Sequence, residues 1–150
     1  MPDDCTLWYA EWEMACCGRW FALGSRVIWP VSRYAVHDGS FLPEGMEREI
    51  GRVDYAYDAH GDSWKGLYTL TGTVKRIRGV YFCFESDSER PGYLRRVSGF
   101  LTEMEDCDYW TAARNAAKRK GPRPRFDAYI VHIEPAEIRP AGKGDRALWT

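Results

Sequence analysis

Five side chains in the sequence could ligate a metal ion: Cys16, Cys17, His37, His60 and His132. Structural zinc takes four nitrogen or sulfur donors in a tetrahedron, and two thiolates usually reach one ion through a C-x₂-C spacing. The sequence has neither that spacing nor H-x₃-H. We therefore predict no metal and no cofactor. The alternative is a metal site built from Cys16, Cys17, His60 and His132 by the fold.

Cys17 is also a candidate nucleophile, because Arg19 follows closely and a nearby cation lowers the pKa of a thiol. A working cysteine needs a base, which His60 or His132 would have to supply through the fold. The simpler interpretation is an unreactive thiol. A Cys17 sulfur within hydrogen-bond reach of either ring, inside a cleft, would support a small enzyme.

Adjacent cysteines are also poorly spaced for a disulfide. Neighbouring Cα atoms lie about 3.8 Å apart, whereas a disulfide prefers roughly 4.4–6.8 Å. The cysteine count of 5 is odd, and no secretory signal is visible at the N-terminus. We therefore expect reduced thiols and a cytoplasmic location.

A run of four acidic residues could contain a general acid–base pair, which requires two carboxylates with different environments. The run consists of Glu103, Glu105, Asp106 and Asp108. Acidic residues are also typical of a helix N-terminus, where the helix dipole stabilises negative charge. We favour that second interpretation, since Asp106 or Asp108 is a suitable N-cap for a helix over 106–120.

A basic stretch flanked by aromatic residues is the best candidate for partner binding. It comprises Tyr109, Trp110, Arg114, Lys118, Arg119, Lys120, Arg123 and Arg125. Local positive charge can bind phosphates, and exposed aromatic rings can stack on bases. The alternative is a solvated helix end whose cations complement the dipole.

Composition excludes several classes of protein. The 150 residues suit one domain, and aromatic residues make up 15% of them, which argues against disorder. No apolar run approaches the roughly 20 residues of a transmembrane helix. The net charge of −1 gives no global attraction to nucleic acid or to a membrane.

Alternating apolar residues and frequent glycine and proline turns predict short strands. We expect strands over 6–14, 27–29, 52–57, 72–77, 80–84, 93–105 and 126–134, with 72–77 and 80–84 joined at Arg78-Gly79 and 93–105 broken at Gly99. The strand over 6–14 should have one apolar face. The tryptophans at positions 8, 12, 20, 29 and 64 are assigned to the core or to strand faces, since each can bury about 150–250 Å².

The predicted fold is mostly β: a small antiparallel barrel or curled sheet with one α-helix in the C-terminal half. One β-rich domain should span 1–140, and 141–150 should form a flexible tail. Plentiful aromatic residues without catalytic spacing favour a non-enzymatic binding or regulatory module. Its partner would be a protein or a nucleic acid, with protein slightly favoured by the charge. An uncovered strand edge could also pair two copies of the chain.

One string near the N-terminus is similar to the opening signature of a small bacterial family of unknown function. The string is Cys16-Cys17-Gly18 followed by Phe21, Gly24, Val27 and Trp29. Weaker matches are Gly72-Thr73-Val74 and the run 102–105. This resemblance implies no activity. Separately, Phe21-x₂-Gly24-x₂-Val27 resembles the strand entry of SH3-like barrels.

Overall fold

The computed structural model describes residues 3–33, 42, 45–61, 63–108 and 124–150, and it is mostly β. The prediction of a mostly β curled sheet is confirmed. The elements are β1 (Asp3–Ala10), α1 (Glu11–Cys17), β2 (Arg26–Ser32), α2 (Met46–Ile50), β3 (Tyr55–Tyr57), β4 (Tyr68–Ser86), β5 (Leu94–Met104), β6 (Pro124–Pro140) and the 3₁₀-helix η1 (Asp145–Ala147).

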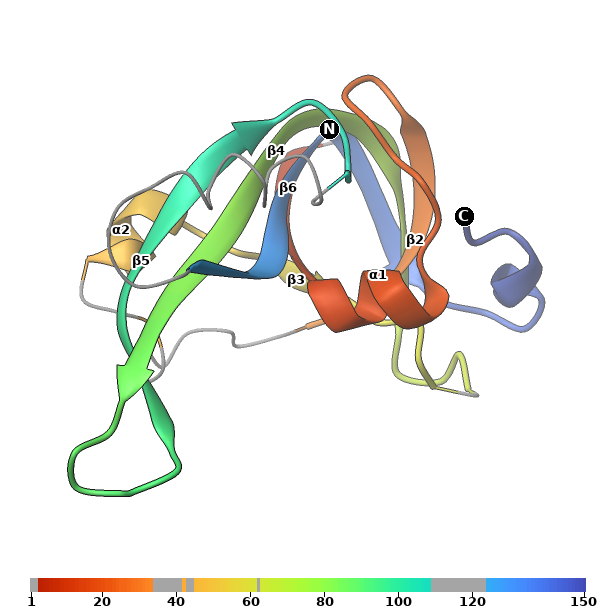
Figure 1. Cartoon of the computed structure of the whole chain (residues 1–150). Helices are drawn as coiled ribbons and strands as arrows, with labels where there is room; N and C mark the ends of the chain where they lie inside the picture. Colours follow the sequence, from red (N-terminus) through yellow and green to blue (C-terminus); the bar gives the residue numbers. More distant parts are fainter. Residues whose placement is uncertain (1–2, 34–41, 43–44, 62, 109–123) are drawn as a thin grey trace.

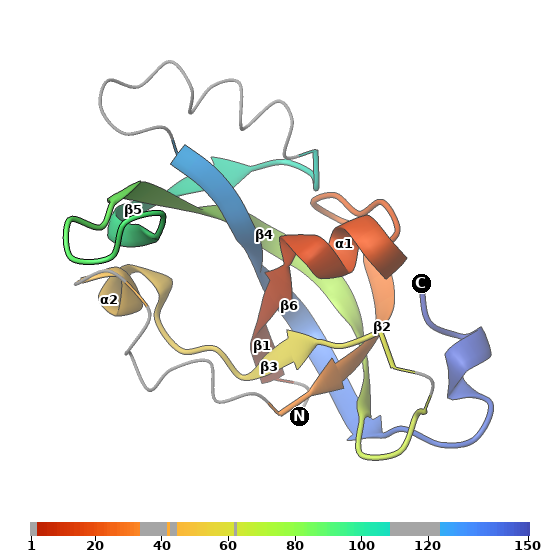
Figure 2. The same cartoon turned by 60° about the horizontal axis from the view of Figure 1, so that its bottom comes forward.

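The six-stranded sheet has the order β2-β3-β1-β6-β4-β5, and an additional pairing of β2 with β4 closes its first part into a ring. Figures 1 and 2 show this ring, with α1 beside one end. β5 lies outside it, paired with the second half of β4. The pairings are antiparallel except for β1 with β3, which is parallel.

Aromatic side chains fill the inside of the closed sheet, and Trp29 is among them, as predicted. Tyr9 is at the centre of this cluster. Its ring stacks on Tyr57 with centroids 3.9 Å apart, and it meets Trp29 and Tyr129 edge-on at 5.3 and 5.8 Å. Such pairs contribute about 0.5–1.5 kcal/mol each beyond area burial.

Two of the tryptophans that we assigned to the core or to strand faces lie elsewhere. Trp12 and Trp20 are 53% and 65% exposed. Both stand outside the strands, Trp12 on α1 and Trp20 in the loop before β2. Trp8 and Trp29 are buried as predicted, and Trp64 is half-buried.

A second apolar cluster lies on the other face of β1, so our prediction of one apolar face for this strand was wrong. Leu7 and Tyr9 belong to the inner core, whereas Trp8 packs in a cluster with Met46 and Ile50 of α2. The side chains of a strand alternate between faces, and α2 covers the face that solvent would otherwise meet.

Several predicted boundaries also differ. β1 ends at Ala10 and α1 begins at Glu11, where Glu11 and Glu13 place negative charge in the first turn. β4 continues without a break through Arg78-Gly79, and β5 through Gly99. Residues 105–108 are not helical. The rest of the predicted helix 106–120 lies outside the described residues. None of the described helices is long and apolar enough to span a membrane.

The C-terminal segment 141–150, for which we predicted a flexible tail, contacts the ring in the structure. Asp145 is buried, and Arg139 donates two hydrogen bonds to its carboxylate at 2.6 and 3.1 Å. The Thr69 hydroxyl donates to the same carboxylate at 2.9 Å. The backbone N–H of Thr150 donates to the carbonyl of Ile28 at 2.8 Å. These polar contacts order a segment whose composition is not strongly apolar.

Asp145→Asn should destabilise the protein in a pH-dependent way. Hydrogen bonds, above all from Arg139, hold the pKa of Asp145 well below its usual range. A carboxyl whose pKa is lower in the folded than in the unfolded protein stabilises the fold at a pH above its unfolded pKa of about 3.9. This contribution is lost as the pH falls towards the folded pKa. Thermal melts should therefore show a lower Tm for the variant at pH 7 and a shrinking difference below about pH 4. The exposed loop variant Glu89→Gln is the control. Equal melting of wild type and Asp145→Asn at pH 7 would contradict this account.

Gly72→Ala should be destabilising by about 1–3 kcal/mol, the usual range for overpacking. A Cβ at Gly72 would overlap the side chain of Ile133 and the carbonyl oxygen of Pro135 on β6. Gly142→Ala is the matched control, because a Cβ there has no neighbour within 4 Å. Urea unfolding measures both variants. If both substitutions lower the free energy of unfolding by the same amount, the predicted overlap at Gly72 is contradicted.

Candidate functional site

Glu13 is a buried carboxylate on the first turn of α1, with 2% of its surface exposed. The backbone N–H of Ala59 donates to its Oε2 at 3.2 Å, and Nδ1 of His60 lies 2.9 Å from its Oε1. Burial raises the pKa of Glu13, and the bonds from Ala59 and His60 oppose that shift. The carboxylate is therefore fixed in orientation and shielded from water.

Asp58 and His60 approach Glu13 from the loop that follows β3. Nδ1 of His60 is 3.1 Å from Oδ1 of Asp58, so two carboxylates converge on one ring nitrogen. One ligand atom from each of the three residues lies within 4.8 Å of the others. We call these three residues the Glu13–Asp58–His60 cluster.

The cluster borders a small pocket of about 160 Å³. The Trp12 and His60 rings meet edge-on, with centroids 5.1 Å apart. Trp12 is half-exposed, so it forms the rim. The pocket is lined by Trp8, Ala10, Trp12, Glu13, Ser32, Ala56, Tyr57, Asp58 and His60. Carboxylates and an imidazole beside such a space can hold a cation or transfer a proton.

The four residues of our alternative metal site do not converge in the structure. His60 joins Glu13 and Asp58, while His132 lies on β6, where its Nδ1 is 3.4 Å from the Thr6 hydroxyl. Its Nε2 is 3.8 and 3.6 Å from carboxylate oxygens of Asp4 and Glu134. Cys16 and Cys17 bond to each other. The histidines therefore occupy separate environments on different strands or loops.

Sequence reasoning missed Glu13 and Asp58 as members of the site. Asp58-x-His60 directly follows the alternating residues of β3, which is a signal that could have indicated two side chains on one side of the chain. We did not consider Glu13 because we predicted a strand over 6–14. In the structure, α1 begins at Glu11 and its first turn directs the carboxylate of Glu13 at Ala59 and His60.

The Cys16–Cys17 disulfide corrects our prediction of reduced thiols at these positions. The structure joins the two sulfurs across a Cα–Cα distance of 3.8 Å, below the range from which we argued. That range describes cysteines that are distant in sequence, whereas these two close a small ring along one peptide bond. Both residues are exposed at the end of α1, and the remaining cysteines, Cys5, Cys83 and Cys107, are buried and free.

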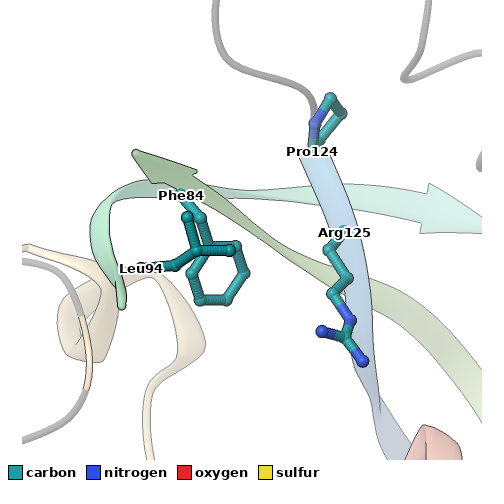
Figure 3. Close-up of a pocket in the computed structure, with 4 residues that line it drawn as sticks. All are labelled: Phe84, Leu94, Pro124 and Arg125. Atoms are coloured by element: carbon teal, nitrogen blue, oxygen red, sulfur yellow. The ribbon is translucent and has the colours of Figure 1, made fainter. Parts of the chain in front are cut away.

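Of the eight predicted partner-binding residues, Arg125 on β6 is described. The other seven are Tyr109, Trp110, Arg114, Lys118, Arg119, Lys120 and Arg123, and they lie outside the described residues. Arg125 is exposed and borders a hollow of about 570 Å³, together with Phe84, Leu94 and Pro124. Figure 3 shows the side chains that line this hollow, Phe84 from β4, Leu94 from β5 and Pro124 and Arg125 from β6.

A second hollow, of about 350 Å³, adjoins the first through Phe84 and Arg125. Its charged lining is balanced, with Arg96 and Arg125 against Glu11 and Asp127. Burial raises the pKa of Asp127, and the two arginines oppose that shift. The guanidinium of Arg96 stacks over the Phe82 ring at 4.2 Å. We call the residues around both hollows the β4–β5–β6 surface.

The acidic run forms no acid–base pair among its described contacts. Arg76 donates two hydrogen bonds to Glu103 at 2.7 and 2.8 Å and thereby lowers the pKa of that carboxyl. Asp106 accepts a hydrogen bond from the backbone N–H of Asp108 at 2.8 Å. These are structural roles in a strand pair and a turn.

The fold and these sites define a mostly β protein that carries a half-buried carboxylate–histidine cluster and an arginine-flanked hollow. The chain belongs to a family of unknown function, DUF6578, whose model matches residues 3–135. This agrees with the resemblance to an uncharacterised family that the sequence indicated. Searches of curated proteins and of solved structures give no match.

Thiol titration tests the disulfide directly. Of the 5 cysteines, 3 are free in the structure, so the denatured, unreduced protein should expose 3 thiols to a thiol reagent. After reduction, all 5 should react. Five reactive thiols before reduction would contradict the Cys16–Cys17 bond. The Cys17→Ser variant is the control, because it cannot form that bond and should show 4 thiols under both conditions, as the count of 5 minus 1 requires.

Proposed function

We propose that this chain is a non-enzymatic binding module whose β4–β5–β6 surface docks a protein partner. The observation that carries the proposal is the hollow between Phe84, Leu94, Pro124 and Arg125. Leu94 is 67% exposed and neighbours Tyr93, which is 66% exposed. Exposed apolar side chains grouped beside arginine are typical of the centre of protein interfaces.

The charge of this surface favours a protein over a nucleic acid. Arg96 and Arg125 are matched by Glu11 and Asp127 around the second hollow, and Arg95 pairs with Glu85 at 2.6 Å. Nucleic-acid sites depend on an excess of cations that neutralise phosphates, which these described residues do not provide. The partner that fits best inserts an apolar side chain between Phe84 and Leu94 and presents a carboxylate to Arg125.

The shape of the sheet supports the same proposal. The end of β4 and the start of β5 extend beyond the ring as a hairpin (Figure 1), and Tyr93 and Leu94 beside its turn are 66% and 67% exposed. Among the described strands, β5 pairs with β4 alone.

The alternative from the sequence, a cysteine–histidine enzyme, lacks a free Cys17 sulfur in this structure. A cytoplasmic location and a bacterial origin stay predictions.

Site-specific photo-crosslinking tests the proposal. A photoreactive amino acid at position 94 should capture one discrete protein in cells, whereas the same group at Leu148, which is 51% exposed, should not. The captured protein is then purified and titrated with the full chain. Leu94→Asp and Arg125→Glu should weaken binding by about tenfold or more, as substitutions at an interface centre do, and Leu148→Asp should leave it unchanged.

Three results would contradict the proposal. One is equal capture from positions 94 and 148. Another is capture of a second copy of this chain, seen as a product of twice its mass. The third is binding of a fluorescent single-stranded oligonucleotide that falls steeply with salt, is lost in Arg125→Glu and survives in Leu94→Asp.

A further inference from the structure

The Glu13–Asp58–His60 cluster brings three potential metal ligands together. In a tetrahedral site, zinc bonds of about 2.0–2.2 Å to nitrogen and oxygen place neighbouring donors roughly 3.3–3.6 Å apart. Nδ1 of His60 is 2.9 Å from Oε1 of Glu13 and 3.1 Å from Oδ1 of Asp58. Separation by a few tenths of an ångström would bring both carboxylate–imidazole distances into that range, and all three ligand atoms lie within 4.8 Å of one another. We propose that this cluster binds a divalent transition-metal cation of the zinc type.

The surroundings of Glu13 support a preformed site. The N–H of Ala59 holds Oε2, which leaves Oε1 directed at Nδ1 of His60. Outer hydrogen bonds of this kind orient metal-binding carboxylates. A buried charge is costly unless it is paired, and two carboxylates beside a neutral imidazole carry two negative charges. One divalent cation neutralises both.

The adjoining pocket provides room for the remaining ligands. Its volume of about 160 Å³ exceeds the roughly 30 Å³ that one water occupies in the liquid. Three protein ligands and an open position are the usual arrangement in a zinc site that is accessible to other molecules. Imidazole nitrogen also discriminates against Mg²⁺, which prefers oxygen ligands.

The competing arrangement is an imidazolium whose Nδ1–H is shared by the two carboxylates, with no metal. It differs from the proposal in what occupies the centre of the cluster. His132 provides an internal comparison, because it also has two carboxylates nearby. Those oxygens are 3.6 and 3.8 Å from its Nε2, and they belong to exposed Asp4 and Glu134. A histidine with more distant carboxylates, whose side chain is 28% exposed against 54% for His60, is therefore present in the same chain as a control.

The experiment is calorimetric titration of the full chain with zinc chloride after removal of metals by a chelator. Wild type should bind one equivalent of zinc and show no comparable heat with magnesium. His60→Ala and Asp58→Asn should each weaken zinc binding by about tenfold or more, as loss of a ligand or of its support does. His132→Ala should bind like the wild type. Circular dichroism checks that every variant is folded, and both changed residues lie at or near the surface.

A double variant, Cys16→Ser with Cys17→Ser, separates this site from zinc bound by reduced thiols. It should retain the full affinity of the wild type. The proposal is overturned if wild type binds no zinc, if His60→Ala binds as tightly as wild type, or if the double cysteine variant loses binding. It is also overturned if His132→Ala weakens binding as much as His60→Ala, since zinc would then bind histidine without regard to the cluster.

Discussion

The three residues of β3 hold the two sides of the barrel together. Leu7 and Trp8 of β1 pair in parallel with Tyr55 and Ala56, while Val31 and Ser32 of β2 pair with the other edge of the same short strand. Without β3, the edges of β1 and β2 would both be open, and buried backbone groups without partners are costly. We call the pairing of β3 with β1 and β2 the seam of the barrel. Two further hydrogen bonds extend it: Asp54 donates its N–H to the carbonyl of Thr6, and Asp58 donates its N–H to the carbonyl of Pro30. The closed ring thus depends on a strand that is short in sequence.

The same seam positions the candidate site. β3 ends at Tyr57, whose ring stacks on Tyr9 in the core, and the next residues of the chain are Asp58, Ala59 and His60. They reach Glu13 because α1 begins where β1 ends, beside the closed ring. Residues 46 positions apart, such as Ala59 and Glu13, are joined by a hydrogen bond. A rigid aromatic core and a polar cluster at its border are therefore two consequences of one strand pairing.

The sequence predicted the parts of the fold that depend on local pattern. β-Branched residues around 69–74 and the alternation of Tyr129, Val131 and Ile133 indicated strands, and turn residues separated them. The parallel register of β1 on β3 could not be predicted, since nothing in three residues specifies a partner so distant in the chain. The burial of both faces of β1 depends on α2, a helix of 5 residues, for which we predicted no element. His60 was singled out by its type, but Glu13 and Asp58 join it through tertiary contacts alone. The contacts of the C-terminal segment could not be predicted, because Asp145 meets Arg139 and Thr69 through the fold.

Backbone amide exchange at the seam, measured by NMR, tests this account most directly. The N–H groups of Asp54, Asp58 and Ala59 donate to Thr6, Pro30 and Glu13. The account predicts that these amides exchange slowly, together with those of β4 and β6, because one closed ring protects all of them. Exchange of the three amides at the rate of an unstructured chain, with β4 and β6 still protected, would show an open sheet and contradict the account.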